Sequence, residues 1–63
     1  MNETSYRIED TAFQFLPASA SSETIRKTVQ VFAEQACVNE AISIAEIDIE
    51  GIVKRLEARI FVK

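Results

Sequence analysis

Three acidic residues, Glu46, Asp48 and Glu50, alternate with apolar residues in the carboxy-terminal half of the chain. Successive side chains of an extended strand point to opposite faces, so these three carboxylates would share one face. Carboxylate oxygens are preferred ligands of Ca²⁺ and Mg²⁺, which makes the three residues the metal-site candidates of this sequence. The simpler interpretation is a solvated acidic face, on which Glu46 pairs with Arg55 of a neighbouring strand. We favour that pairing and expect no metal site, although in a ring-shaped assembly the same acids could bind ions between subunits.

No nucleophile of the chain has an evident activating base, because the sequence contains no histidine. Cys37 is the only cysteine, and one thiol without histidine cannot complete a zinc site. We interpret Cys37 as a small buried apolar residue. No catalytic residue and no cofactor-binding residue is identified, and we expect a protein that is not an enzyme.

The chain has 63 residues, which is enough for one small domain spanning residues 1–63. A domain of this size buries only about 60% of the surface of its unfolded chain and is marginally stable. Disulfides, a metal or self-association usually stabilise such small domains, and a single cysteine cannot form an internal disulfide. Because 48% of the residues are hydrophobic, apolar surface remains to be covered between subunits. We therefore expect a homo-oligomer.

The charge pattern excludes several kinds of partner. The net charge is −3, and nucleic-acid binders usually carry a basic stripe, so we expect no nucleic-acid partner. The first residues lack the basic start and apolar run of a signal peptide. No segment approaches the roughly 20 apolar residues that cross a bilayer, so we expect no membrane association. A free cysteine without a targeting signal favours the cytoplasm.

Residues 42–63 are predicted to form an amphipathic β-hairpin that turns at Glu50 and Gly51. Gly51 is the only glycine, and two-residue hairpin turns favour glycine because it adopts positive φ without strain. Pairing the strands about this turn separates apolar from charged side chains. One face would carry Ala41, Ala45, Ile47, Ile49, Ile52, Leu56, Ala58, Ile60 and Val62.

The same segment has a helical alternative. Ser43 and Glu46 fit a capping box, in which each side chain accepts from the other's backbone N–H at a helix start. A helix from there would place Gly51 in its interior at a cost of about 1 kcal/mol. We favour the hairpin for that reason. The helical stripe would comprise Ala45, Ile49, Ile52, Val53, Leu56 and Ile60.

The clearest helix is predicted over residues 22–38, where apolar residues recur with helical spacing. Ser21 or Ser22 can cap its first turn, because serine accepts a hydrogen bond from a free backbone N–H. Asn39 is the expected end of this helix, in the left-handed conformation. The apolar stripe comprises Ile25, Val29, Phe32, Ala33 and Ala36.

Residues 4–16 are predicted as an edge strand, because apolar and polar residues alternate over residues 6–8 and 13–15. Pro17 follows and ends the strand, since proline lacks a ladder donor. The element order is then β-α-β-β. This order predicts an α+β fold in which one helix covers a three-stranded antiparallel sheet. The alternative is all-α, a helical hairpin that forms a dimeric, histone-like bundle.

In its order of elements the chain resembles the dodecin family of small flavin-binding and storage proteins, which assemble into hollow dodecamers. The similar segments are residues 5–8, 23–29 and 58–62. The family's flavin-stacking tryptophan, expected near Glu40 and Ala41, is absent, and Lys54 stands where its glutamine is expected. The resemblance therefore implies a fold and self-association, and flavin binding does not carry over.

Two functions are consistent with these features. The leading hypothesis is a small, non-enzymatic homo-oligomer that binds or sequesters a small ligand or ion between subunits. Val31 and Val38 lie off the apolar stripe of the predicted helix, which indicates a second buried contact for that helix. The alternative is a protein-interaction module that presents a sheet edge or a helix face to a larger partner.

Overall fold

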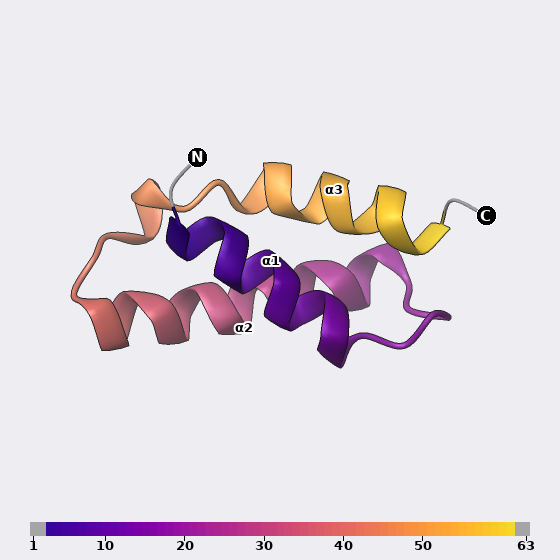
Figure 1. Ribbon diagram of the computed structural model, residues 1–63, viewed down its shortest axis with the longest axis horizontal. Coiled ribbons are helices and arrows are strands. Elements are labelled where there is room, and N and C mark those ends of the chain that lie inside the picture. The colour runs from indigo at the N-terminus through magenta and orange to yellow at the C-terminus, as the bar shows by residue number, and fades with distance from the viewer. Residues whose placement is uncertain (1–2, 62–63) are drawn as a thin grey trace.

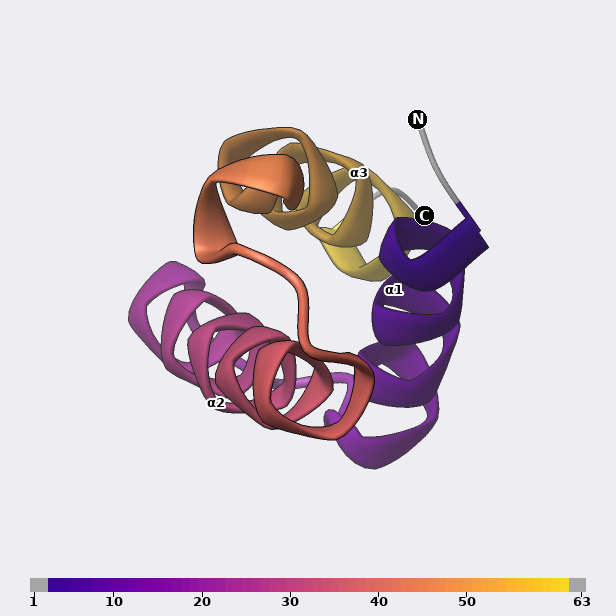
Figure 2. The same cartoon turned by 90° about the vertical axis from the view of Figure 1, so that its left-hand side faces the viewer.

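The computed structural model describes residues 3–61, and this part of the chain forms three α-helices and one short 3₁₀-helix (Figure 1). Their order is α1 (Glu3–Phe15), α2 (Ser22–Glu40), η1 (Ile44–Glu46) and α3 (Ile49–Phe61). α1 and α3 run in similar directions, and α2 runs in the opposite direction (Figure 1). Seen end-on, the three α-helices lie at the corners of a triangle (Figure 2).

α2 confirms the helix predicted over residues 22–38. Ser21 is its N-cap, and its hydroxyl accepts a hydrogen bond from the backbone N–H of Thr24 at 3.2 Å. The residues of the predicted stripe are buried or partly buried, because they recur on the face that meets the other helices. The predicted end at Asn39 is wrong by two residues. Ala41 is the residue that adopts the left-handed conformation, with φ 55°.

α1 replaces the strand predicted over residues 4–16, which is wrong. Ser5, Ile8, Glu9 and Ala12 are buried at spacings of three, four and seven residues, as on one face of a helix. This periodicity was hidden because two of the four buried positions carry polar residues. Pro17 follows the last turn, where a helix ends readily because proline cannot continue it.

α3 replaces the predicted hairpin, which is also wrong. Ser43 and Glu46 form the capping box, but they cap η1 and not the long helix. Asp48 precedes α3, and its carboxylate accepts a hydrogen bond from the backbone N–H of Gly51 at 3.0 Å. Gly51 does not have positive φ, so no turn is built on it. The helical alternative was right for Ile52, Val53 and Leu56, which are buried in α3, and wrong for Ala45, which lies exposed in η1.

The predicted α+β class is therefore wrong, because residues 3–61 contain no strand. The all-α alternative fits, although the described chain has three α-helices where that alternative had a helical hairpin. The resemblance to dodecins depended on a β-α-β-β order and is contradicted by the same observation. None of the helices in the described part of the chain is long and apolar enough to cross a membrane.

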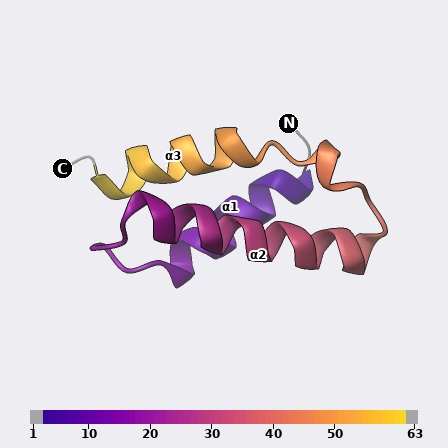
Figure 3. The ribbon, with the colours of Figure 1, turned by 180° about the vertical axis from the view of Figure 1, so that it is seen from behind.

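The core lies between the three α-helices, and α2 contributes to it along its whole length. α2 packs extensively against both neighbours, whereas α1 and α3 meet each other less extensively. The view from behind shows α2 in front of α1, with α3 running above it (Figure 3). The buried apolar residues are Ile8, Ala12, Leu16, Ala20, Ile25, Val29, Ala33, Ile47, Ile52, Val53 and Leu56.

Candidate functional site

A groove of about 240 Å³ opens to solvent between the first half of α1 and the second half of α2. We call it the α1–α2 groove. Its apolar floor is formed by Ile8, Phe32 and Ala36, and the remaining lining side chains are polar. The complete lining is Thr4, Arg7, Ile8, Thr11, Phe32, Gln35, Ala36, Asn39 and Glu40.

Helical spacing places these residues along the groove. Thr4, Ile8 and Thr11 are four and three residues apart and share one face of α1. On α2 the lining residues fall at positions 32, 35, 36 and 39, which again share one face. α1 crosses α2 obliquely, and the two helices separate toward the amino-terminal end of α1 (Figures 1 and 3). The groove lies along this part of the helix pair.

One end of the α1–α2 groove is closed by a polar cluster. Arg7 Nη2 donates to both carboxylate oxygens of Glu40, at 3.0 and 3.1 Å. The Thr4 hydroxyl donates to Glu40 Oε1 at 2.8 Å. The positive and negative charges lie in contact and offset each other, so this end favours neither a cation nor an anion.

The rim of the groove carries polar groups that remain available. The side chains of Thr11, Gln35 and Asn39 have no hydrogen-bond partner among the described residues. Gln35 and Asn39 are four residues apart, so their amides follow one another along the groove. Each amide offers both donors and an acceptor to a molecule lying in the groove.

The apolar floor continues beyond the groove toward the carboxy-terminal end of α1. The ring of Phe32 meets the ring of Phe15 edge to face, with centroids 5.7 Å apart. Phe15 is 72% exposed, so this aromatic pair extends the apolar surface into solvent.

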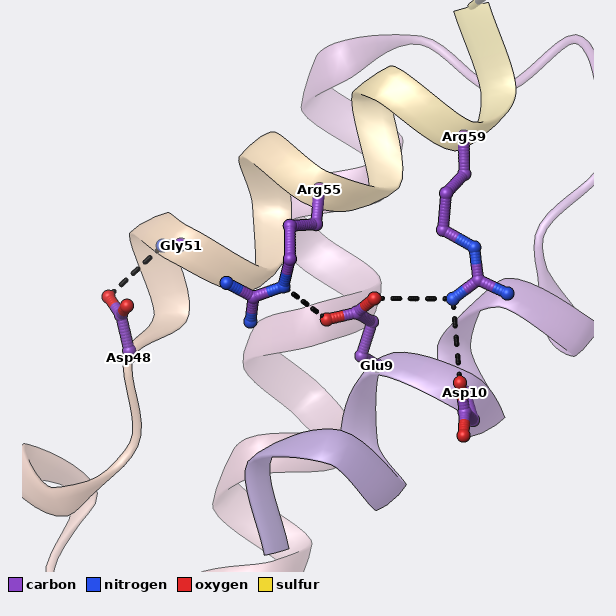
Figure 4. A network of polar contacts seen from close by, with 6 residues as sticks. All are labelled: Glu9, Asp10, Asp48, Gly51, Arg55 and Arg59. Carbon is purple, nitrogen blue, oxygen red and sulfur yellow. Dashed lines mark hydrogen bonds and ion pairs between the residues drawn. The ribbon is translucent and has the colours of Figure 1, made fainter. Parts of the chain in front are cut away.

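A separate charged cluster joins α1 to α3 (Figure 4). Glu9 of α1 is buried, and Arg55 and Arg59 of α3 reach it at 2.5 Å and 3.2 Å. Arg59 also contacts Asp10 at 3.4 Å and lies over the ring of Phe13, 3.9 Å from its centroid. Both arginines neutralise a single buried carboxylate, so the cluster serves to fix the two helices relative to each other.

The structure places the three metal-site candidates on separate partners. Glu46 accepts from the backbone N–H of Ser43 at 3.1 Å, and Asp48 from Gly51 as described above. The carboxylate of Glu50 accepts hydrogen bonds from both Nη atoms of Arg26. Residues 3–61 contain no group of three or more histidine, cysteine or acidic residues placed to hold a metal.

The predicted cross-strand pair of Glu46 with Arg55 is wrong, because no strands exist in the described chain and Arg55 pairs with Glu9.

The Arg26–Glu50 pair perturbs both of its members at the protein surface. The hydrogen bond from Arg26 lowers the pKa of the Glu50 carboxyl below its usual value. The same hydrogen bond and the charge of Glu50 raise the pKa of Arg26. Both side chains are half exposed or more, so the pair is a surface ion pair that ties the start of α3 to α2.

Cys37 is half-buried and packs against the core, as expected for a small apolar residue. The α1–α2 groove itself was not predicted. Phe32 and Ala36 were assigned to the core, but the other wall of the groove depends on residues 4–11 being helical. The helical spacing of Thr4, Ile8 and Thr11 gave no usable signal, because two of these three residues are polar.

Three comparisons with known proteins were made, against protein-family models, curated proteins and solved structures, and none gave a match. The function proposed below therefore rests on the geometry of this chain alone.

Proposed function

We propose that this protein is a non-catalytic interaction module that binds apolar side chains of a protein partner in the α1–α2 groove. The observation that carries the proposal is an apolar floor bordered by amides without partners. Apolar surface favours a partner's apolar side chains, and the amides of Gln35 and Asn39 can hydrogen-bond the adjacent backbone or polar groups. A helix or extended peptide is the expected ligand, since grooves between helices commonly take one.

The size of the groove suits a side chain of a protein partner better than it suits a cofactor. Pockets that enclose drug-sized ligands usually have volumes of roughly 300–1,000 Å³. The α1–α2 groove has about 240 Å³ and is open to solvent along its length. The groove can hold one or two side chains of a larger molecule. The rest of that molecule would contact the rim of the groove.

The hypothesis of a ligand or ion sequestered between subunits receives less support. The groove is small and the metal-site candidates are each engaged by groups of this chain. Catalysis is not part of the proposal, because no nucleophile has a histidine base available in this sequence. We place the module in the cytoplasm, where a lone cysteine such as Cys37 remains reduced.

The test compares two substitutions on α1 that add the same charge. Thr11→Glu places a carboxylate on the groove, and Gln14→Glu places one on an exposed position outside it. Proteins captured from an extract of the source cells by the immobilised wild type are identified, and their affinity is measured by calorimetry. We expect Thr11→Glu to weaken binding at least tenfold, because a charge must be desolvated against an apolar floor.

Gln14→Glu is expected to bind like the wild type, and circular dichroism checks that both variants fold. Equal affinity of the two variants for every captured partner would show that the α1–α2 groove is not the binding site.

A further inference from the structure

A second surface of α2 remains apolar at its centre. Val31 is 55% exposed and Val38 is 77% exposed, seven residues apart on one face of the helix. This face lies opposite the buried stripe of Ile25, Val29 and Ala33. Valine is also a poor helix former, so neither burial nor helix propensity accounts for it at these positions.

The charges that flank Val31 have opposite signs. Lys27 lies one turn before it and Glu34 lies one turn after it on the same face. We call the exposed face formed by Thr24, Lys27, Val31, Glu34 and Val38 the α2 outer stripe. Its members recur at intervals of three and four residues, which is the spacing of a helix–helix seam.

We propose that the α2 outer stripe binds the same stripe of a second copy, with the two α2 helices antiparallel. A two-fold axis beside Val31 brings Lys27 of each copy against Glu34 of the other and places the two Val31 side chains at the centre. An isologous contact of this kind requires a self-complementary surface, which the stripe has. A parallel pair would set Lys27 against Lys27 and Glu34 against Glu34, and like charges repel.

The two charged residues are available for this contact. Lys27 approaches Glu23 only at 4.0 Å, and both side chains are at least 70% exposed. Such surface pairs contribute about 0–1 kcal/mol. Glu34 accepts one hydrogen bond, from the exposed amide of Gln30 at 3.1 Å. Little stabilisation within one copy is therefore lost when Lys27 or Glu34 turns toward a second copy.

A second copy of the chain is the partner that this surface fits best. When the second α2 runs in the opposite direction, the lysine of each stripe faces the glutamate of the other. The α2 outer stripe shares no residue with the α1–α2 groove. Each copy in the dimer thus keeps the groove proposed above for the partner, and the two proposals fail independently.

Disulfide cross-linking tests both the contact and its direction. Each single-cysteine variant is made in the full chain with Cys37→Ser, and oxidised glutathione is the oxidant. Val31→Cys places the thiols beside the proposed axis and is expected to yield a covalent dimer. Val38→Cys is the matched control, because antiparallel helices hold the two positions about 22 Å apart along the axis. It is expected to remain at least tenfold less cross-linked.

Charge reversal then separates a specific contact from random collision. Lys27→Glu is expected to slow cross-linking of the Val31→Cys protein at least threefold, and adding Glu34→Lys is expected to restore it. Equal cross-linking of Val31→Cys and Val38→Cys, no cross-linking of either, or indifference to Lys27→Glu would each overturn the proposal. Circular dichroism confirms that the variants being compared are folded.

Discussion

Glu9 is the one charged side chain that is buried among the described residues. It lies where α1 faces α3, the least extensive of the three helix contacts. A buried carboxylate costs several kcal/mol of desolvation unless charged partners offset it, and here Arg55 and Arg59 do so. The pairing also restricts how α3 can sit against α1, since any shift would leave the carboxylate without its partners.

Replacing Glu9 with glutamine is expected to lower the free energy of unfolding by about 2 kcal/mol. The amide loses the charge that two arginines pair with, and hydrogen bonds to charged groups contribute about 1.5–3 kcal/mol. Urea denaturation followed by circular dichroism measures the change. Asp10→Asn is the control, because Asp10 is 69% exposed and its contact with Arg59 is expected to contribute less than about 0.5 kcal/mol. Similar losses in the two variants would contradict this account of Glu9.

The pKa of the Glu50 carboxyl is expected to lie below the ordinary value of a glutamate, because Arg26 hydrogen-bonds its charged form. A carboxyl with a lowered folded-state pKa stabilises the fold above its unfolded pKa, and that contribution disappears as the pH falls through the folded-state value. Carbon-13 NMR of the side-chain carboxyl measures the midpoint. Arg26→Gln is expected to move the midpoint upward, and an unchanged midpoint in that variant would contradict the pairing.

At the scale of the elements, the sequence pattern predicted α2 correctly. The same kind of analysis predicted strands where the structure has α1 and α3. α2 was predictable because its apolar residues recur only with helical spacing and a serine precedes them. Residues 45–60 fit two periods at once, since their apolar residues match both an alternating strand face and a helical stripe. Gly51 favoured the strand interpretation, whereas in the structure it lies in the first turn of α3 with the Asp48 carboxylate close to it. A Cβ at position 51 would sit 2.8 Å from Asp48 Cγ.

α1 was missed for a different reason. Its buried face includes Ser5 and Glu9, so hydrophobicity alone does not reveal the helical period. Since one wall of the α1–α2 groove belongs to α1, the groove could not be predicted either. The partners of Glu9 lie on α3, far along the chain, so the local sequence pattern of α1 does not show them.

The end of α2 provides a test at the same scale. Ala41 has φ 55°, a left-handed conformation that glycine adopts more readily than alanine. Ala41→Gly is therefore expected to raise the free energy of unfolding by about 0.5–1 kcal/mol, measured by urea denaturation. Ala58→Gly is the matched control inside α3, where glycine is expected to cost about 1 kcal/mol. A loss of stability in Ala41→Gly would show that α2 does not end as described.

In the molecule as a whole, three faces of α2 have different environments. One face of α2 holds the core, an adjacent face forms the α1–α2 groove, and the α2 outer stripe faces solvent. This arrangement suits a small interaction module, because one central helix fixes the geometry of both proposed contact surfaces. Two of the exposed large apolar residues lie at these surfaces, Val38 on the α2 outer stripe and Phe15 beside the α1–α2 groove.

The central claim is that α1 and α3 are helices packed on α2, because the groove, the Glu9 cluster and the proposed contacts all depend on it. Backbone carbon-13 chemical shifts measured by NMR in solution test this residue by residue. We predict Cα shifts displaced to the helical side throughout residues 3–15, 22–40 and 49–61. Strand-type displacements over residues 4–16 or 52–61 would contradict the three-helix arrangement and the function proposed from it.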